Sequence, residues 1–185
     1  MALPARALAT GARRGEVCAL RWCDVDLEDR FVRISRSVSQ TTSGGVIVKC
    51  TKTDRARVVS ITRAATAALS QRRIEAELAA ESAGCRLAPS GLVFSPDPAG
   101  QAPWPPAIAT RCWKRLRDEA ELGRVRLHDL RHFVATELLS AGVDPRTVSN
   151  RLGHGRTSTT SDIYWAWVPA RDREAADYLD ALLEG

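Results

Sequence analysis

Residues 128–133 read HDLRHF, and we predict that they open a helix over about 128–141. The apolar side chains of this segment recur at the spacing of one helix face: Leu130, Val134, Leu138 and Leu139. His128 and Arg131 are three positions apart, so the imidazole and the guanidinium share a face. At a helix start, this pair can grip one phosphate group, and the helix dipole adds to the attraction. Taken alone, the pair also fits an ordinary solvated surface near a helix end.

A second helix follows within residues 138–154, which read LLSAGVDPRTVSNRLGH. A glycine turn separates it from the first, Asp144 can cap it with Pro145 at its first position, and Gly153 can end it at about 145–152. His154 then lies just beyond the helix end. Tyr164 stands ten residues later beside an isoleucine, a setting in which a tyrosine is usually an anchored core residue.

The residues before 62 predict a turn, a short helix and a small sheet. The stretch 10–16 reads as a turn followed by a helix start, with Val17, Leu20 and Trp22 as buried contacts. Three short alternating stretches then predict a three-stranded antiparallel sheet, and they cover residues 31–35, 45–49 and 57–61.

The rest of the chain predicts helices and one long loop. Residues 84–106 hold most of the prolines around a short buried piece at 92–94, so we interpret them as an internal linker. The remaining helices are expected at 63–82, 107–121, 159–165 and 170–183. The predicted fold class is therefore α+β, mainly helical with a small antiparallel sheet.

Bulk properties restrict the class of protein. A chain of 185 residues suits one domain with a real core, and no apolar run is long enough to cross a bilayer. No export signal is visible, which predicts a cytoplasmic protein. The five cysteines are scattered, without the two-residue spacing of zinc or redox sites, and we expect reduced thiols. Residues 1–75 carry 14 Arg or Lys against 7 Asp or Glu, and such a basic surface attracts polyanions.

Four stretches in this order resemble the tyrosine recombinases, also called phage integrases. They are TGARRGE (10–16) with LRW (20–22) and DVD (24–26), TKT (51–53) before a strand, HDLRH (128–132), and LGH (152–154) with Tyr164. The resemblance covers nearly all of the chain. It implies that residues 1–185 form the mainly helical catalytic domain of such an enzyme, with the family's usual N-terminal DNA-binding domain absent.

The resemblance also implies which residues hold the scissile phosphate. Arg13 and Arg131 would clamp its non-bridging oxygens, and His128 and His154 would add hydrogen bonds. Glu16, one turn after Arg13, would support the site without touching the substrate. This chemistry needs cations, because a phosphodiester repels nucleophiles through its own charge, and charge builds on its oxygens during attack.

Two further residues would carry the bond changes. Tyr164 would attack phosphorus to form a 3′-phosphotyrosine, and Lys52 would protonate the leaving oxygen, with His128 able to accept the tyrosine proton. The covalent ester conserves the bond energy, so resealing needs no ATP. No metal and no cofactor are expected. The implied partners are double-stranded DNA and further copies of the chain, in the tetrameric synapse typical of the family.

Other interpretations stay open at this point. His128 and His132 are four apart, as in a zinc hydrolase helix, but Asp129 replaces the motif's glutamate and Arg131 would place a positive charge beside the metal. Residues 128–152 also resemble a non-catalytic helix-turn-helix DNA-binding module, or the chain is an inactive integrase remnant. Trp165 and Trp167, after the tyrosine, depart from the smaller or polar residues expected there.

Overall fold

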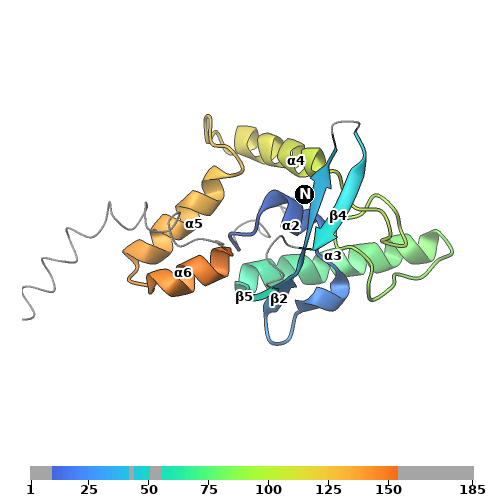
Figure 1. The fold of residues 1–185 in the computed structure, drawn as a ribbon. Coiled ribbons are helices and arrows are strands. Elements are labelled where there is room, and N and C mark those ends of the chain that lie inside the picture. Colours follow the sequence, from blue (N-terminus) through green and yellow to red (C-terminus); the bar gives the residue numbers. More distant parts are fainter. Residues whose placement is uncertain (1–9, 42–43, 51–55, 154–185) are drawn as a thin grey trace, which may run out of the picture. The chain divides into compact units, whose positions relative to one another are not determined.

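The computed structural model describes residues 10–41, 44–50 and 56–153 (Figure 1). The chain divides into two compact units, Met1–His132 and Phe133–Gly185.

The strands of the first unit form two small antiparallel sheets. In the first, β2 (Phe31–Ile34) lies between β1 (Val25–Asp26) and β5 (Arg57–Ser60). In the second, β3 (Arg36–Gln40) pairs with β4 (Val46–Cys50), and Figure 1 shows this pair as a hairpin.

The predicted strands are therefore present, but their grouping into one sheet was wrong. Residues 45–49 were expected to share a sheet with 31–35 and 57–61, and instead β4 pairs with its neighbour in sequence, β3. The reason is local: the turn between them is closed by hydrogen bonds from the Thr41 N–H to the Gly45 carbonyl and from the Gly44 N–H to the Thr41 carbonyl. The place beside β2 is taken by β1.

Three α-helices and one turn of 3₁₀-helix complete the described part of the first unit. They are α2 (Arg14–Cys18), the 3₁₀ turn η1 (Trp22–Asp24), α3 (Arg63–Ser82) and α4 (Pro106–Glu119). The helix α3 has the predicted bounds, and the Thr62 hydroxyl caps it by accepting a hydrogen bond from the Ala65 N–H. Its buried face packs on the first sheet, where Ala65 and Leu69 join Val32 and Val59 in one apolar core.

The loop between α3 and α4 is part of that core, so the prediction of an internal linker at 84–106 was wrong. Val93 and Phe94 are 0% and 2% exposed, as the predicted buried piece required. The backbone is also tied back, because the Val93 N–H donates to the Leu20 carbonyl and the Trp22 N–H donates to the Gly91 carbonyl. This loop is therefore packed as part of the first unit.

The second unit contains most of α5 (Asp129–Ser140) and all of α6 (Pro145–Leu152). Its described core consists of four buried side chains: Ala135, Leu139, Val148 and Leu152. The predicted ends of α6 are confirmed, since Asp144 accepts a hydrogen bond from the Thr147 N–H and Gly153 ends the helix at φ 67°. The helices predicted at 159–165 and 170–183 lie outside the described residues.

The cysteines agree with the expectation of unpaired thiols. All five belong to the described part of the chain and are free. Burial raises the pKa of the Cys18 thiol to about 11, so this cysteine stays protonated at neutral pH. Across the described residues, the structure has no helix with the length and apolarity that a bilayer crossing requires.

Candidate active site

A buried carboxylate, Glu16, is the centre of the candidate site. It lies in the short helix α2, and its side chain is 2% exposed. Its Oε1 accepts hydrogen bonds from Arg13 Nη1 at 3.0 Å and Arg57 Nη1 at 3.1 Å. Its Oε2 accepts from the Arg13 backbone N–H at 2.8 Å and from Arg57 Nη2 at 2.6 Å. Both oxygens therefore carry two donors each, close to the full capacity of a carboxylate.

The two arginines keep Glu16 ionised. Burial raises the pKa of its carboxyl, but the hydrogen bonds and charges of Arg57 and then Arg13 outweigh this, and the pKa lies below its ordinary value. The bond to the Arg13 N–H also caps α2, because Glu16 occupies the third helical position. One carboxylate thus fixes both the start of the helix and the guanidinium of Arg13.

Close packing fixes α2 from the other side. Gly15 lies against β3, and a Cβ built on it would stand 2.3 Å from the carbonyl oxygen of Val38, which no real Cβ tolerates. Below it, Cys18 and Ala19 are buried with Val38 and Ala109, so α2 is held between β3 and α4. The close approach of α2 to β3 therefore requires a glycine at position 15.

Arg131, which lies on α5, is close enough to Arg13, Arg57 and Glu16 to interact with them electrostatically. It is 5% exposed, and its Nη1 donates a 2.5 Å hydrogen bond to the carbonyl oxygen of Gly11, whose φ of 79° suits the glycine in that turn. Its Nη2 is buried and has no hydrogen-bond partner among the described residues. A buried donor of this kind is unfavourable unless a ligand satisfies it.

The electrostatics of Arg131 show what surrounds it. Burial lowers its pKa to about 10, the charges of Arg13 and Arg57 act in the same direction, and Glu16 opposes them. Arg131 remains cationic at neutral pH. Arg13 and Arg57 bind the Glu16 carboxylate, and Arg131 lies near enough to feel its charge, so the three arginines and Glu16 together carry a net charge of +2. Such an arrangement suits an anion with several oxygens.

His128 lies at the start of α5, and its imidazole meets that of His132 edge to face, with ring centroids 4.9 Å apart. Burial lowers the pKa of His128, and the charges of His132 and Arg131 lower it further. The imidazole is therefore neutral at pH 7 and can accept a proton. Its other neighbour, Asp129, is engaged with Arg126 at 2.9 Å.

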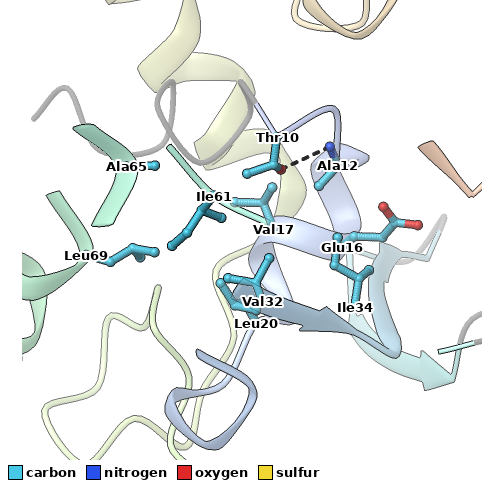
Figure 2. A pocket seen from close by; sticks show the side chains of 10 residues that line it. All are labelled: Thr10, Ala12, Glu16, Val17, Leu20, Val32, Ile34, Ile61, Ala65 and Leu69. Carbon is cyan, nitrogen blue, oxygen red and sulfur yellow. Dashed lines mark hydrogen bonds between the residues drawn. The ribbon is translucent and has the colours of Figure 1, made fainter. Parts of the chain in front are cut away.

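A small cavity lies beneath Glu16 (Figure 2). It measures about 20 Å³, and its wall is mostly apolar, with Ile61 and Leu69 opposite α2. Figure 2 shows the Glu16 carboxylate turned away from these two side chains. A space of this size holds about one water molecule and cannot hold a nucleotide. This cavity is therefore too small to be a nucleotide-binding site.

The described part of the site contains four of the predicted residues. Arg13, Glu16 and Arg131 come together with Arg57, and His128 lies close enough to Arg131 for its pKa to respond. The other predicted residues lie outside the described residues: Lys52, His154 and Tyr164.

Arg57 is the residue that the sequence analysis missed. It was assigned only to a strand, where a charged side chain is usually solvated. The available signal was the alternation of 57, 59 and 61, because Val59 and Ile61 face the core and Arg57 must share their face.

Comparisons with known proteins identify the family of the chain. A family model described as the phage integrase family matches residues 3–170. The chain belongs to the phage integrase family.

Two curated relatives support the same assignment. The ICEBs1 integrase of Bacillus subtilis (strain 168) is 32% identical over 178 residues, which are 96% of this chain and 47% of that protein. A tyrosine recombinase XerC-like protein of Caldanaerobacter subterraneus is 30% identical over 188 residues, with 95% and 48% covered. The chain thus spans about half the length of these relatives.

Solved structures agree on the fold. The Tn1549 transposon integrase in complex with transposon right end DNA matches with a TM-score of 0.71 at 19% identity, covering 94% of this chain and 58% of that one. The XerA recombinase matches with a TM-score of 0.62 at 26% identity, covering 85% and 49%. The predicted α+β recombinase fold is confirmed.

Proposed function

We propose that this chain is the catalytic part of a site-specific DNA recombinase, which cleaves and rejoins DNA strands through a covalent 3′-phosphotyrosine at Tyr164. One observation carries the proposal: two guanidinium groups bind one buried carboxylate, a third from Arg131 interacts with it electrostatically, and Nη2 of Arg131 is buried without a partner among the described residues. A phosphodiester with two non-bridging oxygens would satisfy that donor and the net positive charge. Membership of the phage integrase family supports DNA as the source of the phosphate.

The described residues would act on the phosphate before and during attack. Arg13 and Arg131 would donate to its non-bridging oxygens, where charge accumulates in the transition state. Neutral His128 would accept the phenol proton as the Tyr164 oxygen bonds to phosphorus. Glu16 would hold Arg13 in place from behind. Because these donors are fixed before substrate arrives, little reorganisation accompanies the reaction.

The bond changes balance without an external energy source. As the tyrosine oxygen bonds to phosphorus, the bond from phosphorus to the 5′ oxygen breaks, and Lys52 would give its proton to that oxygen. His154 would add a hydrogen bond to the phosphate. Attack by a 5′ hydroxyl on the phosphotyrosine reverses each step and restores the phenol. A phenol pKa of about 10 makes it a better leaving group than an alkanol.

The wider setting is proposed on the same basis. The partners would be double-stranded DNA and other copies of the chain in a tetrameric synapse, and residues 1–185 would act as one catalytic domain. With DNA as substrate, we place the protein in the cytoplasm. The alternative of a non-catalytic helix-turn-helix module or inactive remnant finds no support in the comparisons.

The nucleophile can be tested against a matched control, because the chain has only two tyrosines, Tyr164 and Tyr178. With duplex DNA nicked beside the cleavage position, wild-type protein should form a protein–DNA species that survives denaturation by detergent. Tyr164→Phe should form none, whereas Tyr178→Phe should form it normally. An adduct in Tyr164→Phe, or its loss in Tyr178→Phe alone, would show that the nucleophile is another residue.

The role of Lys52 can be isolated by changing the leaving group. Lys52→Ala should slow cleavage of ordinary DNA by about a hundred- to ten-thousandfold, because an alkoxide leaves badly without a proton. A substrate with sulfur at the bridging 5′ position should restore near wild-type rates, since a thiolate with a pKa near 8.5 needs no acid. Arg131→Ala should gain no such rescue. Equal rescue of both variants would contradict the assignment.

A further inference from the structure

Arg57 is bound to Glu16 more completely than Arg13 is. Its Nη1 and Nη2 meet the two carboxylate oxygens at 3.1 and 2.6 Å, in the forked geometry that guanidinium and carboxylate groups favour. The Arg57 side chain is 12% exposed, against 45% for Arg13. Arg13 is thus the arginine that reaches the surface, and Arg57 lies behind it.

We propose that Arg57 is a positioning residue, which fixes the bound phosphate indirectly by holding Glu16 and, through it, Arg13. This inference rests on the proposed function for the role of Arg13, and it adds a residue that the predicted site did not contain.

The first argument is the position of Arg57 in its strand. Arg57 pairs with Ile34 across β2 and β5, and Val59 in the same strand pairs with Val32. Those three neighbours are 4%, 1% and 4% exposed, for Ile34, Val59 and Val32 respectively. A guanidinium on this inward face is unfavourable unless a carboxylate meets it there. Glu16 is that carboxylate.

The second argument is what Glu16 needs during turnover. When Arg13 also donates to a phosphate, that anion competes with Glu16 for the positive charge of Arg13, and a carboxylate whose side chain is 2% exposed would be left with less compensation. Arg57 retains its own two hydrogen bonds to the Glu16 carboxylate. Glu16 then remains ionised and oriented, so Arg13 does not lose its alignment when substrate binds.

The third argument concerns the free protein. A side chain as exposed as that of Arg13 samples many rotamers, and freezing them on binding opposes affinity. A carboxylate fixed by Arg57 selects the rotamers in which Arg13 points to the site. The contribution of Arg57 should therefore depend entirely on Glu16.

A double-mutant cycle tests that dependence. The rate of adduct formation on nicked DNA is measured for wild type, Arg57→Met, Glu16→Gln and the double variant. We expect Arg57→Met to slow adduct formation about tenfold or more when Glu16 is present, and less than threefold in the Glu16→Gln background. DNA affinity should change much less than the rate, because many phosphate contacts contribute to the affinity for DNA, whereas Arg57 acts through Arg13 on the scissile phosphate alone.

Two controls separate positioning from charge. Arg33→Met removes a charge from an exposed position of β2, opposite Val58 and away from Glu16, and should leave the rate within about threefold of wild type. Arg57→Lys keeps the charge but loses the fork, so it should recover only part of the rate. Circular dichroism melting of each variant confirms that it is folded, and Arg57→Lys replaces Arg57→Met in the cycle if the latter does not fold.

A second measurement keeps the inference distinct from the proposed function. Titration of ¹⁵N-arginine-labelled protein with inorganic phosphate follows the Arg13 side-chain N–H signal, which is assigned from its absence in Arg13→Lys. Phosphate should perturb it in wild type, and about tenfold more phosphate should be needed in Arg57→Met, even if no adduct forms on DNA. The inference is overturned if Arg57→Met behaves as wild type, or if its loss is as large without Glu16 as with it.

Discussion

His128 has an environment that keeps its imidazole uncharged. Burial and the charges of His132 and Arg131 all lower its pKa, and only Asp129 among its stronger neighbours opposes them. Because the pKa lies below the ordinary value of about 6.5, the imidazole remains a proton acceptor as the pH falls toward that value. Activity that depends on neutral His128 should therefore be lost only at more acidic pH.

This pKa can be measured by NMR, since the chain has three histidines. The His128 ring protons should titrate below pH 6.5. His132→Gln should raise the midpoint, because a repelling charge is removed, and Asp129→Asn should lower it, because an attracting charge is removed. Movement of the midpoint in the same direction in both variants would contradict this account.

Gly15 should tolerate no side chain. Gly15→Ala would drive a Cβ into the Val38 backbone, where the neighbour cannot move aside, and should lower the free energy of unfolding by about 1–3 kcal/mol. Urea denaturation measures the loss, and Gly84→Ala is the comparison, because nothing lies within 4 Å of its added Cβ. Gly84 has a φ of 67°, so that variant reports backbone strain alone. Adduct formation should fall only in Gly15→Ala, since α2 carries Arg13 and Glu16.

Single residues show where prediction from sequence works. Arg13, Glu16 and Arg131 were found because each belongs to a recognisable motif. Arg57 was not, because its importance depends on pairing between β2 and β5 and on the distance to Glu16, 41 positions away. The alternation of 57, 59 and 61 indicates that Arg57 faces inward, but neither the strand pairing nor the distance to Glu16 is encoded in a local pattern.

Among the elements, α6 depends on its cap. Asp144→Ala removes the acceptor for the Thr147 N–H and should lower the free energy of unfolding by about 1 kcal/mol. Asp144→Asn should retain most of the stability, because asparagine caps helices about as well. Hydrogen exchange of the α6 amides would localise the effect. Equal losses in the two variants would show that the charge of Asp144, rather than the cap, stabilises the helix.

Helices with such end signals were predicted to the residue, whereas the sheet was not. Thr62 fixes the start of α3, and Asp144 and Gly153 fix both ends of α6, through contacts within three or four residues. Strand pairing has no comparable local rule. Alternation identified the strands at 31–35, 45–49 and 57–61, but the turn at 41–45 decided that β4 would pair with β3.

At the scale of the whole molecule, the proline content predicted the boundary between the two units at the wrong place. The proline-rich stretch at 84–106 suggested a linker, yet its core contacts make it part of the first unit, and the division falls at His132 and Phe133, within α5. Proline and glycine indicate irregular backbone, but they do not show whether that backbone is packed.

Among the described residues, Nη2 of Arg131 is buried without a hydrogen-bond partner, so a bound anion would satisfy a donor that these residues leave open. Arg131→Met would remove this unsatisfied donor but would also leave the Gly11 carbonyl without its donor, so the two effects oppose each other and the melting temperature should stay within a few degrees of wild type while adduct formation is abolished. Inorganic phosphate should stabilise wild type and have less effect on the variant. Under the proposed function, the arginine at position 131 is retained for the phosphate it binds, and a drift toward apolar residues there would be the signature of a copy released from that constraint.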